Sequence, residues 1–169
     1  MAFCRQCGSP VGEHHPEWKK YFDDQQVTGC IEIYDLKKSA FIDYNADRCA
    51  QRFIPASAFG ICLALIALES KTPLGKGSWS MQEVAEKIGQ EKMQRYLNLL
   101  HYGNGKTGTS VDSFWLSGDL RISCDEQIEF LKNLYTYQLP VTKRTIDSVK
   151  GMMVIEKKLA YLLSGKTGW

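Results

Sequence analysis

The first part of the chain has the pattern of a small β-sheet. Residues 28–34 and 39–44 are rich in β-branched and aromatic side chains, and the polar segment Asp35-Leu36-Lys37-Lys38 separates them. Two such runs joined by a short polar segment predict a β-hairpin. Residues 18–24 predict a short helix just before it.

Further along the chain, longer apolar segments and helical repeats of apolar residues predict a block of helices. Residues 57–70 are apolar nearly all round, which is typical of a central helix that is buried on most sides. Residues 80–100 repeat their apolar side chains with a helical period and predict one long amphipathic helix. Ser123 and Glu126 have the spacing of a capping box at the start of another helix, and residues 142–158 predict one more.

A strand-like run at residues 160–164 completes the pattern. Two strands, a helical block and one late strand indicate an α+β fold rather than alternating βαβ units. Residues 1–17 contain glycine and proline with almost no apolar period, so they predict an irregular N-terminal arm. The expected organisation is therefore an arm at 1–17 and one domain at 18–169.

The composition is typical of a soluble globular protein. Of the 169 residues, 44% are apolar and 24% are charged, and 21 basic against 19 acidic residues leave a net charge of +2. Without basic blocks, this balance predicts no nucleic-acid or membrane-surface partner. The longest apolar run, 61–68, is too short to span a membrane, and residues 1–18 lack the apolar region of a signal peptide. The sequence as written predicts a cytoplasmic protein.

Six cysteines raise the question of a metal site. Only Cys4 and Cys7 have the spacing of metal ligands, and they form half of a zinc knuckle. A closed zinc site has four ligands, and the residues able to complete it are His14, His15 and Cys30. The alternative is an arm without metal. Without an export signal the thiols are expected to be reduced, and Cys30 and Cys62 to be small buried hydrophobic residues.

Six short blocks of sequence, taken in chain order, carry a resemblance to a known family. They are Arg52-Phe53-Ile54-Pro55-Ala56-Ser57-Ala58-Phe59, Ala64-Leu65-Ile66-Ala67-Leu68-Glu69, Tyr102-Gly103-Asn104, Val111-Asp112-Ser113-Phe114-Trp115-Leu116, Leu120-Arg121-Ile122-Ser123 with Glu126-Gln127, and Lys166-Thr167-Gly168-Trp169. In these blocks, residues 18–169 resemble the class D (oxacillinase-type) serine β-lactamases. The resemblance implies the β-lactamase/transpeptidase-like (penicillin-binding) fold, with a helical block against an antiparallel sheet, and a β-lactam as the small-molecule ligand.

The resemblance also implies where the chemistry takes place. Ser57 has the position of the nucleophile at the start of a buried helix, where the helix N-terminus favours a developing oxyanion. Lys166, Thr167 and Gly168 match the strand that meets the substrate carboxylate. The same tripeptide occurs at 106–108, but only the copy at 166 follows a strand-like run.

Two further motifs have a structural alternative. Tyr102, Gly103 and Asn104 match a motif at the edge of the family's site, and a helix-ending turn at Gly103 is an equal alternative. Trp115 matches a tryptophan that hydrogen-bonds the family's base, and here it is expected to be a core aromatic residue.

Three departures from the family's pattern bear on activity. The family's base is a carbamylated lysine one helical turn after the nucleophile; this position is Gly60, so no carbamylated-lysine cofactor can form and no other cofactor is expected. The family's Ser-x-Val element aligns with Lys76-Gly77-Ser78, after an internal shortening near residues 70–74, and a slip of one or two residues would bring Ser78 or Ser80 to this place instead. Two more strands and a terminal helix follow the Lys-Thr-Gly strand in the family, so unpaired sheet edges and self-association are expected here.

The sequence therefore predicts a class D β-lactamase family member with impaired catalysis. The alternatives are a β-lactam-binding protein that is acylated at Ser57 without turnover, and a non-functional truncated remnant. A working hydrolase would need Lys166 or Lys76 as its base, and nothing in the sequence places either lysine beside Ser57. The resemblance implies a periplasmic or secreted family, in contrast to the cytoplasmic expectation above.

Overall fold

The structure, a computed structural model, describes residues 12–74 and 79–167. Its elements in chain order are β1 (Glu13–His14), a 3-10 turn η1 (Pro16–Trp18), α1 (Lys19–Asp23), β2 (Ile31–Asp35), β3 (Ala40–Tyr44), α2 (Ala46–Cys49), a 3-10 turn η2 (Ala56–Phe59), α3 (Gly60–Glu69), α4 (Met81–Ile88), α5 (Gln90–Leu99), α6 (Cys124–Tyr135), α7 (Lys143–Met152), β4 (Val154–Lys157) and β5 (Leu162–Ser164). This is the α+β arrangement that the sequence predicts.

The N-terminal sheet contains the predicted hairpin. β2 and β3 pair antiparallel, with Ile33 opposite Ile42, and the strand order is β1-β3-β2. β1 was not predicted. Glu13 and His14 pair with β3 in parallel, so these two residues of the expected irregular arm form a strand along an edge of β3. Residues 1–11, with Cys4 and Cys7, lie outside the described residues.

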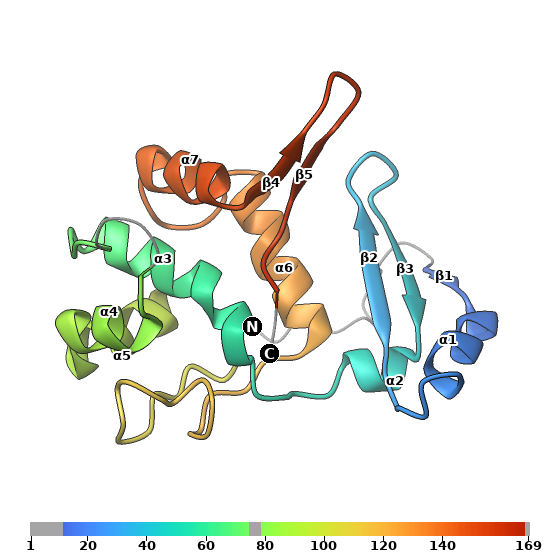
Figure 1. The fold of residues 1–169 in the computed structure, drawn as a ribbon, viewed down its shortest axis with the longest axis horizontal. Coiled ribbons are helices and arrows are strands. Elements are labelled where there is room, and N and C mark those ends of the chain that lie inside the picture. Colours follow the sequence, from blue (N-terminus) through green and yellow to red (C-terminus); the bar gives the residue numbers. More distant parts are fainter. Residues whose placement is uncertain (1–11, 75–78, 168–169) are drawn as a thin grey trace.

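The core forms around α3. Every residue from Gly60 to Ala67 is buried, and α3 packs against α4 and α7 (Figure 1). Burying one large apolar side chain contributes roughly 1.5–3 kcal/mol to folding, so this helix is a main source of stability. Because α3 is buried on all sides from Gly60 to Ala67, this part of the sequence has no polar face. No helix of the described residues is long and apolar enough to cross a membrane.

Two predicted helices are shorter in the structure. Gly89, with φ of +78°, ends α4 and separates it from α5, so residues 80–100 form two helices rather than one. The helix predicted over 142–158 ends at Met152, because Val154–Lys157 pairs with Leu162–Ser164 as a β-hairpin. The late part of the chain therefore contributes two strands instead of one.

The two sheets are separate in the described part of the chain: no ladder joins β4–β5 to β1–β3–β2. Figure 1 shows the β4–β5 hairpin extending beyond the helices, with β5 on the side that faces β2. The hairpin exposes apolar side chains, with Ile155 at 65% and Leu162 at 59% exposure. In the described part of the chain, β4 and β5 pair only with each other.

Candidate active site

Ser57 lies in a strained turn at the entrance to α3. It is half-buried within η2, one residue after Ala56, whose φ is +47°. A left-handed conformation at a residue other than glycine is unfavourable unless its surroundings hold it. The Ala56 N–H donates to the Trp115 carbonyl oxygen at 2.9 Å, and this bond fixes the turn that presents Ser57.

The sequence blocks that begin at Arg52, Val111 and Leu120 meet around this turn. Phe53 and Ile122 exchange two backbone hydrogen bonds, both of 2.9 Å. Beside them, Arg52 Nε donates to Glu126 Oε2 at 2.9 Å, and Glu126 completes the capping box of α6 with Ser123. The segment that leads to Ser57 is thereby attached to the start of α6.

Glu126 gives a prediction for stability and its pH dependence. Burial opposes ionisation, but the Arg52 guanidinium and the Ser123 N–H outweigh it and lower the pKa of Glu126 below its usual 4.5. We expect Glu126→Ala to destabilise the fold by about 1–2 kcal/mol, since it removes both the cap and the ion pair. Glu126→Gln retains a capping residue and should cost less, about 0.5–1 kcal/mol for a partly exposed pair.

The sign of the pH effect follows from the lowered pKa. The ion pair stabilises the fold at pH values above the unfolded-state pKa, and its contribution is lost as the pH falls through the lower folded-state pKa. Urea unfolding at decreasing pH should therefore show the wild type and Glu126→Gln converging in acid. A difference that stays constant with pH would contradict the assigned ion pair.

Trp115 is a core aromatic residue, as expected. It is 1% exposed and stacks on Phe59 with ring centroids 5.3 Å apart, and Phe114 meets it edge-on at 5.0 Å. Phe59 is the last residue of the block that contains Ser57. This aromatic cluster therefore packs against the end of η2, the turn that contains Ser57, and the Trp115 carbonyl oxygen accepts the hydrogen bond from Ala56 at its start.

The Tyr102-Gly103-Asn104 motif forms a turn after α5. The Tyr102 hydroxyl donates to Gln127 Oε1 at 2.9 Å, and burial raises its pKa well above the usual value. Asn104 Oδ1 accepts from the Arg121 N–H at 3.0 Å, and its Nδ2 donates to the Asp119 carbonyl at 2.8 Å. These contacts assign the motif a structural role in joining the end of α5 to the segment before α6.

Gly60 has a neighbour that the sequence did not identify. A Cβ atom on Gly60 would lie 3.3 Å from Lys166 Cε and 3.6 Å from Met81 Sδ. The Lys166 amine is one bond further and donates to the Thr167 carbonyl at 2.8 Å. The Lys166 side chain therefore lies beside Gly60. Thr167 is exposed, whereas Lys76, Ser78 and Gly168 lie outside the described residues.

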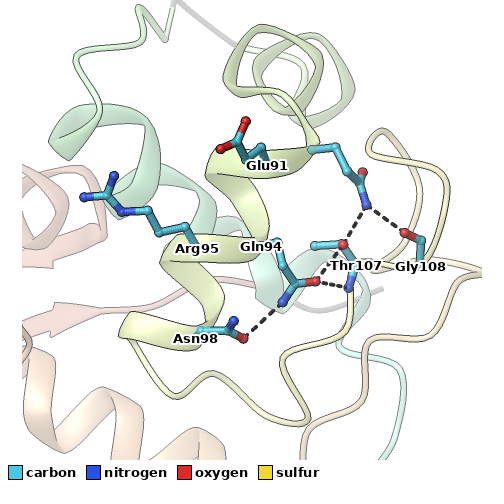
Figure 2. A pocket seen from close by; sticks show the side chains of 7 residues that line it. Glu91, Gln94, Arg95, Asn98, Thr107 and Gly108 are labelled. Carbon is cyan, nitrogen blue, oxygen red and sulfur yellow. Dashed lines mark hydrogen bonds between the residues drawn. The ribbon is translucent and has the colours of Figure 1, made fainter.

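The other Lys-Thr-Gly copy belongs to a loop beside α5, as its sequence context predicts. Figure 2 shows this loop at a polar pocket, where Thr107 contacts Gln94 and Gly108 lies close by. Thr107 Oγ1 donates to Gln94 Oε1 at 2.9 Å and accepts from Gln90 Nε2 at 2.7 Å. None of the residues that line this pocket belongs to the Ser57 site.

The residues proposed to complete a zinc knuckle have other contacts. His14 Nδ1 is 2.8 Å from Asp43 Oδ1, and His15 Nδ1 is 2.6 Å from Glu17 Oε1. Cys30 Sγ is 3.6 Å from Cys124 Sγ, and these two cysteines form a group with Cys49, in which all three sulfur atoms lie within 4.8 Å of one another. No spacing pattern in the sequence predicts that these three cysteines meet, because they are far apart along the chain. Cys62 is buried within α3, as expected, and burial raises its pKa.

The three grouped thiols influence one another's ionisation. Hydrogen bonding from Cys49 is the main cause that lowers the pKa of Cys124, to about 6. Burial, followed by the contact with Cys124, raises the pKa of Cys30 to about 11. Cys124 is thus the thiol that ionises first.

Comparison with known proteins agrees with this architecture. The family described as "Penicillin binding protein transpeptidase domain" matches residues 76–169. The fold, with a serine at the entrance of its central helix, therefore defines a penicillin-binding/transpeptidase-type protein.

Individual relatives narrow the family. Beta-lactamase OXA-5 of Pseudomonas aeruginosa is 33% identical over 90% of this chain and 68% of its own length, and OXA-48 of Klebsiella pneumoniae is 30% identical over 93% and 70%. The class D β-lactamase FUS-1 of Fusobacterium nucleatum superposes with a TM-score of 0.86 and 32% identity over 93% of this chain and 77% of that one. The chain belongs to the class D β-lactamase family.

A solved structure that is described as a receptor domain and not as a β-lactamase has the same fold. The C-terminal domain of the Bacillus licheniformis BlaR penicillin-receptor superposes with a TM-score of 0.83 and 26% identity, over 94% of this chain and 76% of that domain.

Proposed function

We propose that this protein binds β-lactams and becomes acylated at Ser57, and that release of the product is slow or absent. The observation that carries the proposal is Gly60, which has no side chain to carbamylate or to accept a proton. The likeness to a penicillin-receptor domain supports a β-lactam-binding role for this fold.

The reaction requires proton transfer at two stages. In acylation, the Ser57 oxygen attacks the lactam carbonyl carbon, the C–N bond breaks, and the serine proton must reach the departing nitrogen through a base. In deacylation, a water molecule must lose a proton as it attacks the ester. A positioned general base contributes about 10²–10⁴-fold to such a step. We propose Lys166, whose side chain lies beside Gly60, as the base for the first step; position 60 supplies nothing for the second.

Covalent labelling tests the proposal. Incubation with a fluorescent penicillin should give one adduct per chain on the peptide that contains Ser57, and the adduct should persist after free ligand is removed. Nitrocefin should show no sustained turnover. Ser57→Ala should abolish labelling, whereas Ser117→Ala, at an exposed serine after Trp115, should not alter it.

The other outcomes identify the alternatives. Absence of any adduct would favour a remnant that binds no β-lactam, and rapid nitrocefin turnover that depends on Ser57 would favour a working hydrolase. We expect Gly60→Lys alone not to restore turnover, because the new side chain would compete with Lys166 for the same space.

We also propose that copies of this chain associate through the β4–β5 hairpin. Ile155 and Leu163 are 65% and 48% exposed on this hairpin, and exposed apolar strands with open edges pair with other chains. Size exclusion should show an apparent mass that rises with concentration, and less so for Ile155→Lys with Leu163→Lys. Leu99→Lys, at an exposed leucine of α5, is the matched control. A compact monomer at every concentration would contradict this association.

A further inference from the structure

Three cysteine side chains from separate parts of the chain meet beside the N-terminal sheet. The sulfur atoms of Cys30, Cys49 and Cys124 all lie within 4.8 Å of one another. We infer that these three cysteines form a site for a thiophilic metal ion of the Zn²⁺ class, independent of the β-lactam site.

Each ligand is held by an ordered element. Cys30 immediately precedes β2, Cys49 is the last residue of α2, and Cys124 is the first residue of α6. The capping box between Ser123 and Glu126 fixes the start of α6, and α6 and α2 both pack against β2. The three sulfurs are therefore brought together by the fold itself, which is what a preorganised site requires.

The spacing fits shared coordination. With a Zn–S distance of about 2.3 Å and tetrahedral geometry, neighbouring sulfurs lie about 3.8 Å apart. The Sγ atoms of Cys30 and Cys124 are 3.6 Å apart, and the third sulfur is within 4.8 Å of both. A disulfide would need an S–S distance of about 2.05 Å, so the arrangement is one of separate thiols that need only small shifts to become ligands.

The chemistry of the group selects soft cations. Three thiolates favour Zn²⁺ or Cu⁺ over Mg²⁺, Ca²⁺ or Mn²⁺. All three cysteines would bind Zn²⁺ as thiolates, so those that are still protonated would release their protons to solvent, and the site would carry one net negative charge. Arg48 places positive charge near Cys30 and Cys124, which offsets part of the opposing effect of Asp125 on Cys124.

Little is lost when the thiols become ligands. The Cys49 Sγ lies 3.6 Å from the Ile31 carbonyl oxygen and 3.8 Å from the Tyr44 carbonyl oxygen, so its S–H has only long, weak contacts with these acceptors. Cys49 is buried, whereas Cys30 and Cys124 are half-buried. This partial exposure gives a fourth ligand, such as water, a way to reach the ion.

A bound ion would connect two parts of the molecule. It would link β2 and α2 of the N-terminal sheet to α6, and the described part of the chain has no strand ladder from that sheet to β4–β5. An ion that binds the folded state and not the unfolded state stabilises the fold by mass action. The site would therefore attach the sheet to the helical block.

Cobalt binding to the reduced full-length chain tests the inference. We expect one Co²⁺ per chain, with sulfur-to-cobalt charge-transfer bands and the visible bands of a tetrahedral site. Zn²⁺ should displace Co²⁺ and raise the unfolding temperature, and Mg²⁺ should do neither. Cys49→Ala and Cys124→Ala should each lose the charge-transfer bands.

Two controls separate this site from the other cysteines. Cys62→Ala, which changes a buried cysteine in α3, should retain the cobalt spectrum. A double variant, Cys4→Ser with Cys7→Ser, should also retain it, and loss of the spectrum only in that variant would overturn the inference in favour of the N-terminal arm. Because Cys49 is buried, so that its substitution also changes the core, protection of Cys30 and Cys124 from alkylation when Zn²⁺ is added to the wild type provides a readout without substitutions. Unchanged alkylation at both residues would overturn the inference.

Discussion

Gly103→Ala is expected to lower the unfolding temperature by about 10 °C, or to prevent folding, through a loss of more than about 3 kcal/mol. Gly103 has φ of +54°, and a Cβ atom there would lie 2.2 Å from the Arg121 carbonyl oxygen. The left-handed conformation alone costs an alanine roughly 1 kcal/mol. The backbone clash adds more, because Arg121 is itself held by Asn104.

Gly151→Ala is the matched control for this prediction. Gly151 lies in α7, and a Cβ atom there would meet nothing within 4 Å. Alanine favours a helix over glycine by up to about 1 kcal/mol, so thermal unfolding should be unchanged or slightly higher. A Gly103→Ala protein with normal stability and altered β-lactam labelling would instead favour a role for this motif at the edge of the ligand site.

The parts of the fold that depend on local signals were predictable from sequence. The apolar run of α3, the capping box of Ser123 and Glu126, and the hairpin of β2 and β3 each contain their own signal within a few residues. The helix expected over 80–100 was wrong at Gly89, because an amphipathic period can continue across a glycine that turns the backbone. The helix expected over 142–158 was too long, since the pairing of β4 with β5 outweighs helical preference after Met152.

The site was predictable where it depends on motifs and not where it depends on contacts between distant residues. The motif around Ser57 predicts the position of the nucleophile, and Gly60 stands where the family's pattern has its base lysine. Nothing in the sequence places Lys166 beside Gly60, because more than half of the chain separates them. The group of Cys30, Cys49 and Cys124 has no spacing pattern for the same reason: only the packing of α2 and α6 against β2 brings the thiols together.

Lys166→Ala and Lys166→Arg are both expected to slow the labelling of Ser57 by about 100-fold or more. The physical reason is the position of the lysine, whose Cε lies 3.3 Å from the point where a side chain on Gly60 would begin. Arginine keeps the positive charge that would meet a substrate carboxylate, but its pKa above about 12 prevents it from accepting a proton. Lys87→Ala, at an exposed lysine of α4, should label normally.

The arginine variant separates the two roles that Lys166 can have. If the lysine only attracts the substrate carboxylate, Lys166→Arg should label nearly as fast as the wild type, and the assignment of Lys166 as proton acceptor would be wrong. If it accepts the Ser57 proton, both variants should be equally slow, because charge alone does not replace a base. If Lys166 is the base for acylation and no residue is the base for deacylation, the protein is expected to keep the β-lactam as an ester on Ser57 and not to hydrolyse it.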